Sequence, residues 1–127
     1  MSVVVGWISS DAGRTALQHA VQEAGRRSTD LVVLGTRPGS AEEAELRADV
    51  ELLRASSGVE VSIRHLTGDR DAAEELIDVS FEEETEVIVL GIRRRSPVGK
   101  LLLGSTSQRV LLEAQCPVTA VKPPLPA

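Results

Sequence analysis

The feature of the sequence that most constrains the fold is a regular alternation of short apolar runs with segments of helical periodicity. The runs occupy residues 3–7, 31–35, 59–63, 87–90 and 118–121, and short apolar runs rich in β-branched residues are typical of strands. Strands that alternate with helices are joined by right-handed crossovers, which gives a largely parallel sheet with helices on both faces. We therefore predict a single-domain, doubly wound α/β fold with five strands and four helices.

The polarity of the individual runs predicts the order of the strands. Val59, Val61 and Ile63 alternate with polar residues, and a period of two is typical of a strand with one face in water, as at a sheet edge. The runs at 3–7 and 87–90 have no such alternation, which indicates central strands. We therefore predict the order 3-2-1-4-5.

Capping residues predict where the helices begin and end. Ser9 and Ser10 precede the first helix, which is expected to stop at residues 25–27, and Gly58 is expected to close the second. Capping boxes are expected at the other three helix starts, formed by Ser40 with Glu43, Asp71 with Glu74, and Ser105 with Gln108.

The composition argues against several classes of partner. The net charge is −5 and the aromatic residues are one tryptophan and one phenylalanine, so the chain has neither the positive field nor the stacking rings that nucleic-acid binding needs. No apolar run is long enough to cross a membrane. The N-terminus lacks the pattern of a secretory signal, and Cys116 is a lone cysteine; we therefore expect a cytoplasmic protein without a metal site.

The segment most informative about function is residues 91–107, which follows a predicted strand and opens a predicted helix. Glycines at 91, 99 and 104 let the backbone approach an anion closely. The N–H groups of Ser105, Thr106 and Ser107 at the helix start point toward such an anion. The alternative is that Gly91 and Gly104 only permit tight turns and Ser105 is a simple cap, and composition does not separate the two interpretations.

Gly91, Gly104 and Ser105 also fall on the spacing of a family signature. The segment resembles the C-terminal signature of the universal stress protein family, and the similarity extends to residues 3–17, 67–69 and 116–118. The resemblance implies an adenine-nucleotide α-hydrolase-like fold over residues 1–122, followed by a proline-rich tail at residues 123–127.

In the ATP-binding members of that family, the phosphates rest on the backbone of this loop. The resemblance therefore implies that ATP or another adenine nucleotide binds here, with the nucleoside side at Ile8 and Ser9. The phosphate side would be formed by Gly91, Arg94, Gly99, Gly104, Ser105, Thr106 and Ser107.

Two positions depart from the nucleotide-binding pattern. Ile8 stands where the nucleotide binders carry an aspartate, which removes polar contacts to the nucleoside end. Arg94 replaces the second signature glycine and adds a guanidinium suited to phosphate. The loop from Arg93 to Lys100 resembles a subtype of the family.

The function expected from this resemblance is that of a stress-response regulator that binds an adenine nucleotide weakly or conditionally. No catalytic base or metal-ligand set is evident, so an enzyme is not expected, and a slow ATPase ranks lowest. The alternative is an interaction module in which Ile8 and Arg94 have closed the nucleotide site. The regulator and the interaction module are both expected to act as a homodimer. The resemblance implies that its subunits pair through Val118, Thr119, Ala120 and Val121.

Overall fold

The computed structural model describes residues 1–94 and 101–124. The strands are β1 (Ser2–Gly6), β2 (Asp30–Leu34), β3 (Val61–Arg64), β4 (Thr85–Gly91), β5 (Arg93–Arg94), β6 (Leu101–Leu102) and β7 (Val118–Val121). The helices are α1 (Asp11–Arg27), α2 (Ala41–Ser57), α3 (Ala72–Val79) and α4 (Ser105–Glu113). None of the helices in these ranges is both long and apolar enough to cross a bilayer.

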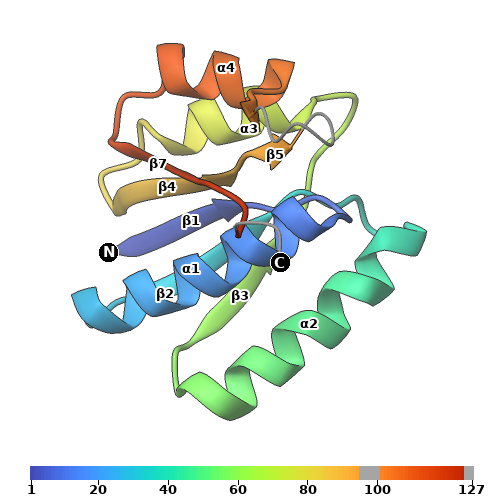
Figure 1. Cartoon of the computed structure of the whole chain (residues 1–127), viewed down its shortest axis with the longest axis vertical. Helices are drawn as coiled ribbons and strands as arrows, with labels where there is room; N and C mark the ends of the chain where they lie inside the picture. The colour runs from blue at the N-terminus through green and yellow to red at the C-terminus, as the bar shows by residue number, and fades with distance from the viewer. Residues whose placement is uncertain (95–100, 125–127) are drawn as a thin grey trace.

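Within the described ranges, five of the strands form one parallel sheet in the order β3-β2-β1-β4-β7 (Figure 1). Numbered by their position in the chain, these five strands have the order 3-2-1-4-5, so the predicted topology is confirmed. As expected, β3 lies at an edge, where Val61 is buried and Ser62 is exposed. The interiors of β1 and β4 are buried, because helices cover both faces of the central strands.

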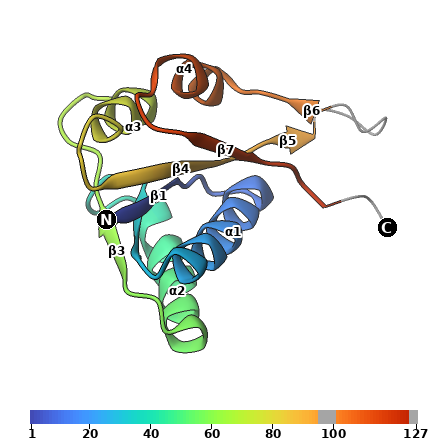
Figure 2. The ribbon, with the colours of Figure 1, turned by 90° about the vertical axis from the view of Figure 1, so that its left-hand side faces the viewer.

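The two faces of the sheet have separate hydrophobic cores. Val3, Val5 and Trp7 point from β1 and its end into the core shared with α1 and α2, whereas Val4 points to the core beneath α3 and α4. This alternation is the ordinary period of a strand. Figure 2 shows the two pairs of helices on opposite sides of the sheet.

The helix ends agree with the predicted caps only in part. Ser10 caps α1 by accepting a hydrogen bond from Gly13 N, and the box of Asp71 with Glu74 is formed. Helix α1 runs through Gly25 to Arg27, and Ser28 takes the left-handed conformation that ends it. The other two predicted boxes are not formed. Ser40 is the N-cap of α2 but makes no side-chain capping bond, and the N-cap of α4 is Gly104, so that Ser105 is the first residue of the helix and not its cap.

The segment between β4 and α4 contains structure where the sequence predicted a loop. Arg93 pairs with Leu102 and Arg94 with Leu101 in an antiparallel ladder, β5 with β6. This pairing returns the chain to the carboxyl end of β4, so that the start of α4 and the end of β4 line the same pocket. Gly99 lies outside the described residues, and Arg94 is described only by its backbone.

Candidate functional site

A pocket of about 400 Å³ opens where the carboxyl ends of β1 and β4 meet. The chain leaves β1 toward α1 on one face of the sheet and leaves β4 toward α4 on the other. Ligands of doubly wound sheets bind at such reversals, because the diverging connections leave a crevice above the strand ends. The residues lining the pocket are Gly6, Trp7, Ile8, Ser9, Ser10, Gly13, Leu34, Ala72, Leu76, Leu90, Gly91, Arg93, Gly104, Ser105, Thr106 and Ser107.

The pocket brings together predicted site residues that are far apart in the sequence. Ile8 and Ser9, predicted for the nucleoside side, lie in the same pocket as Gly91, Gly104, Ser105, Thr106 and Ser107. The predicted Gly99 lies outside the described residues, as does the side chain of Arg94. The arrangement therefore provides one space with a helix start at one end and the turn after β1 at the other.

The helix start offers backbone N–H groups to this space. Gly104 is the N-cap, with an extended backbone and no side-chain hydrogen bond to the first turn. Consequently no capping side chain competes for the N–H groups of the first helical residues, Ser105, Thr106 and Ser107. Unsatisfied N–H groups at a helix start, together with the helix dipole, favour an anion there.

The turn after β1 is largely apolar on the side of the pocket. Ile8 is 47% exposed and lies at the pocket wall. The hydroxyl of Ser9 donates to Glu45 Oε2 at 2.5 Å, and Arg14 Nη2 donates to the other oxygen of the same carboxylate at 2.7 Å. Because its hydroxyl donates to α2, Ser9 has no proton left to donate to a ligand.

Two glycines allow the elements around the pocket to approach closely. A Cβ on Gly13 would lie 1.9 Å from the carbonyl oxygen of Ile8, and one on Gly91 would lie 2.3 Å from that of Ala12. Both distances are far below van der Waals contact, so neither position accepts a side chain without a backbone shift. Gly91, predicted for the phosphate side, is thus required at least for packing β4 against the start of α1.

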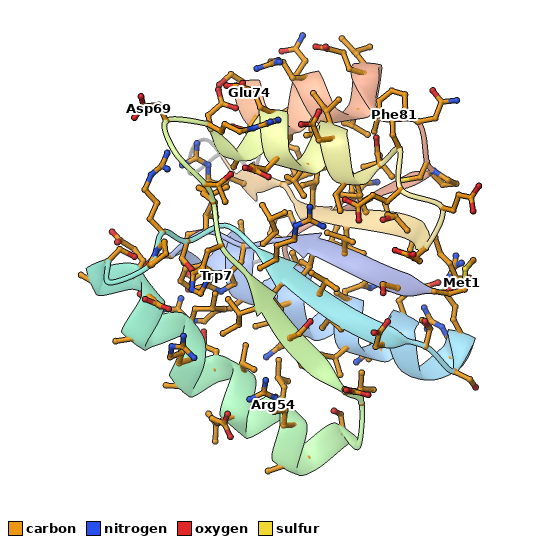
Figure 3. The ribbon with its side chains drawn as sticks, turned by 180° about the vertical axis from the view of Figure 1, so that it is seen from behind. Met1, Trp7, Arg54, Asp69, Glu74 and Phe81 are labelled. Atoms are coloured by element: carbon orange, nitrogen blue, oxygen red, sulfur yellow. The ribbon has the colours of Figure 1, made fainter. Side chains whose placement is uncertain are left out.

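A second pocket of about 360 Å³ continues from Ile8 toward the loop after β2. Trp7 lines both pockets, and Figure 3 shows it on the side of the sheet that α2 covers. The indole Nε1 of Trp7 and the hydroxyl of Thr36 are buried, and neither has a hydrogen-bond partner among the described residues. Buried polar atoms without partners are uncommon, and both residues belong to this second pocket.

Ion pairs fix the loops that surround the second pocket. Glu43 accepts hydrogen bonds from Gly39 N, Arg47 and the ring of His65. The Gly39 N–H contributes most, followed by His65 and Arg47, and together they hold the pKa of Glu43 at about 2, against an ordinary 4.5. The carboxylate therefore stays ionised at mildly acidic pH, and the loop after β2 keeps its anchor to α2.

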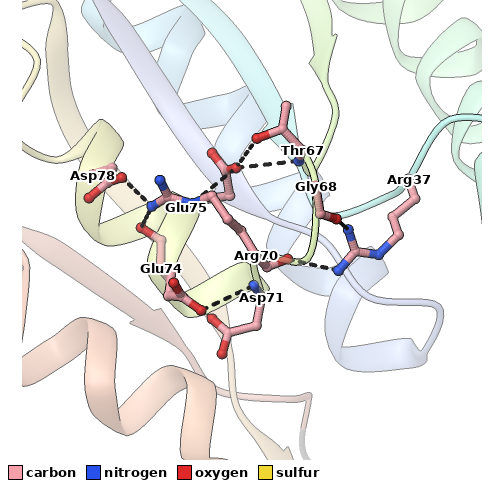
Figure 4. Close-up of polar contacts among 8 residues, drawn as sticks. All are labelled: Arg37, Thr67, Gly68, Arg70, Asp71, Glu74, Glu75 and Asp78. Carbon is pink, nitrogen blue, oxygen red and sulfur yellow. Dashed lines mark hydrogen bonds and ion pairs between the residues drawn. The ribbon is translucent and has the colours of Figure 1, made fainter.

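A polar cluster joins the loop after β2 to the loop after β3 (Figure 4). Arg37 donates to the carbonyl oxygens of Gly68 and Arg70, at 2.6 and 2.7 Å. The buried carboxylate of Glu75 accepts from Thr67 Oγ1 at 2.7 Å and pairs with Arg70. The start of α3, which supplies Ala72 and Leu76 to the first pocket, is therefore held by hydrogen bonds as well as by its apolar face.

The sequence interpretation missed several lining residues. Arg93 was not among the predicted site residues, and Leu34, Leu76 and Leu90 are core-type residues on strands and a helix. The rule that ligands lie at strand ends could have indicated Leu34 and Ser10, whereas the contribution of α3 depends on how that helix packs across the sheet.

Comparisons with known proteins point to one family. The sequence profile of the universal stress protein family matches residues 1–122. A universal stress protein of Mycolicibacterium smegmatis is 44% identical over 128 residues, which cover 95% of this chain and 97% of that protein. A universal stress protein of Mycobacterium tuberculosis is 32% identical over 93% of this chain, but the match spans only 47% of that longer protein.

Solved structures with the same fold include two of universal stress proteins from Archaeoglobus fulgidus. One superposes with a TM-score of 0.78 and 30% identity, covering 94% of this chain and 97% of the other. The second, solved in complex with dAMP, has a TM-score of 0.75 and 25% identity, covering 94% and 96% of the two chains.

Proposed function

The chain belongs to the universal stress protein family, and on that premise we propose that it binds an adenine nucleotide in the pocket between β1 and β4. One observation carries the proposal: a single pocket joins the uncapped start of α4 to the exposed face of Ile8. The dAMP complex of an Archaeoglobus fulgidus relative supports the same ligand class.

The proposed orientation places the phosphates at α4 and the nucleoside toward Ile8. Ser105, Thr106 and Ser107 supply N–H donors, and the glycines at 91 and 104 keep the nearby backbone free of side chains. Because Ile8 offers no acceptor and the Ser9 hydroxyl donates to Glu45, the ribose gains little from this end. We therefore propose weak or conditional binding, with ATP or a related adenine nucleotide as ligand.

The test is a calorimetric titration of the purified chain with ATP, ADP and AMP. Saturable binding at one site per chain, without release of inorganic phosphate from ATP, is the expected result, since we propose a binding protein and not an enzyme. Absence of binding at millimolar concentrations of all three nucleotides would contradict the proposal.

The second candidate function is an interaction module that binds no nucleotide. The apolar Ile8 at the pocket wall and the engagement of Ser9 with Glu45 favour it, because they remove polar contacts from the nucleoside end. In that case the titration gives no signal and the replacement of Arg94 by glycine does not restore one.

We also propose a homodimer through the outer edge of β7. This strand has β4 as its sheet neighbour and its residues are half-buried. Ile88 N donates to Pro117 O and Ile92 N donates to Val121 O, and in a parallel ladder alternate residues face the same neighbour. Thr119 therefore faces β4, whereas the backbone groups of Val118 and Ala120 face away from it and can pair with a second copy.

Replacing Ala120 with proline should weaken this dimer, because proline removes an outward N–H donor that the second copy would use. Sedimentation equilibrium should show a dimer for the parent chain and mostly monomer for the variant at the same concentration. Thr119→Pro is the contrasting variant, since it removes a donor that faces β4 and should lower the stability of the fold itself. A parent chain that is monomeric at high micromolar concentration would rule the dimer out.

The remaining features are proposed on the family resemblance and the sequence alone. They are a family domain over residues 1–122 with a proline-rich tail at 123–127, a cytoplasmic location, and a family subtype defined by the loop from Arg93 to Lys100. Residues 95–100 and 125–127 lie outside the described part of the chain.

A further inference from the structure

Arg93 is the one ionisable residue among the described residues that line the first pocket. Its guanidinium lies beside the start of α4, because Nη2 of Arg93 is the nearest atom to a Cβ built on Gly104, at 3.8 Å. Strand pairing with Leu102 holds the backbone of Arg93 at this place. The positive charge of Arg93 therefore lies next to the uncapped N–H groups at the start of α4.

Within the described part of the chain, the guanidinium of Arg93 differs from those of the other arginines because it has no hydrogen-bond or ion-pair partner. Each other arginine whose side chain is described donates to a carboxylate or to a backbone carbonyl. Arg93 makes no hydrogen bond or ion pair with a described side chain, although the chain carries 19 acidic residues against 14 lysines and arginines. An unpaired guanidinium in a pocket without described carboxylates is suited to an anion that the protein does not itself supply.

We propose that Arg93 makes the site selective for ligands with more than one phosphate group, so that it prefers nucleoside di- and triphosphates to monophosphates. The inference rests on the proposed nucleotide binding and specifies its ligand. The first turn of α4 has N–H groups enough for one phosphate group, and the planar guanidinium at its side adds donors for a further one. A ligand with a single phosphate leaves one of these two sets of donors unused.

The experiment compares the affinities of AMP, ADP and ATP for the parent chain and for Arg93→Gln by calorimetry. The variant should bind ADP and ATP about tenfold more weakly, as expected for loss of a charge-assisted hydrogen bond at a partly exposed site. Its affinity for AMP should change by less than about threefold, so the ratio of the ATP affinity to the AMP affinity should fall by more than about threefold. Arg93→Lys should keep part of that preference because it keeps the charge.

Arg109→Gln is the matched control, since it removes the same charge from α4 at a residue that pairs with Glu113 and does not line the pocket. An equal loss in this control, or an unchanged ratio of ATP to AMP affinity in Arg93→Gln, would overturn the inference. A loss seen with Arg94→Gln and not with Arg93→Gln would also overturn it and assign the role to Arg94. If the parent chain binds none of the three nucleotides, the proposed function fails and the inference with it.

Discussion

Gly13→Ala is expected to destabilise the fold by about 3 kcal/mol or more, whereas Gly25→Ala on the same helix should stabilise it by about 0.5 to 1 kcal/mol. The two substitutions add the same methyl group to α1. At Gly13 the new Cβ would lie 1.9 Å from the carbonyl oxygen of Ile8, and the clash can be relieved only by moving backbone. At Gly25 the nearest atom is a methyl carbon of Val59 at 3.9 Å, an ordinary contact.

The opposite signs follow from different causes. Alanine at an unhindered helix position reduces the conformational entropy of the unfolded chain, which favours folding. At Gly13 this gain is smaller than the steric cost, because the turn from β1 to α1 is held on both sides by the sheet and the helix. Urea unfolding followed by circular dichroism measures both variants, and equal effects at the two positions would contradict the close approach of α1 to Ile8.

The same close approach also links stability to the pocket. Ile8 and Ser9 line the pocket from the turn that Gly13 contacts, so a shift of that turn displaces the proposed nucleoside side of the pocket. A chain carrying Gly13→Ala that still folds should therefore bind nucleotide more weakly, whereas Gly25→Ala should leave binding unchanged.

The strand order could be predicted from the sequence because the burial of a strand determines which of its residues are apolar. Exposed and buried residues alternate along β3, whereas residues 87–90 in the interior of β4 are all apolar and buried, and these two patterns separate the edge from the centre. The position of the pocket followed from the same topology, since a doubly wound sheet has its crevice where the winding reverses.

Details of the helix starts could not be predicted, because a capping pattern states which bonds are possible and not which are made. Glu43 has the spacing for a box with Ser40 but instead bonds Gly39, Arg47 and His65. His65 lies at the end of a different strand, and no local pattern contains it. The capping box of Asp71 with Glu74 formed as predicted.

The position of Arg93, on which its proposed role depends, could also not be predicted from the sequence. Three consecutive arginines, residues 93–95, are equivalent in composition, and only the pairing of β5 with β6 places the first of them beside Gly104. Conversely, Gly91 matches the signature, but the sequence could not show that its lack of a side chain is also needed where β4 meets Ala12. Both facts depend on contacts between elements distant along the chain.

The prediction with the largest effect on ligand binding concerns Gly104, the N-cap of α4. Its backbone is extended, with φ −68° and ψ 166°, and among the described residues only the guanidinium of Arg93 lies within 4 Å of a Cβ built there. The fold itself therefore accepts a side chain at this position, and Gly104→Val should cost only about 1 kcal/mol, the ordinary penalty for a poor N-cap.

Nucleotide binding should respond far more strongly to the same change. The methyl groups of valine would occupy the space between the guanidinium of Arg93 and the first turn of α4, where we propose that phosphate binds. Losing contacts to both sets of donors should weaken ADP binding by about a hundredfold, with Gly104→Ala intermediate because its single methyl group leaves Arg93 in ordinary contact. Calorimetry with ADP measures the loss and urea unfolding verifies the fold; a folded Gly104→Val chain with the parent's affinity for ADP would place the phosphates elsewhere.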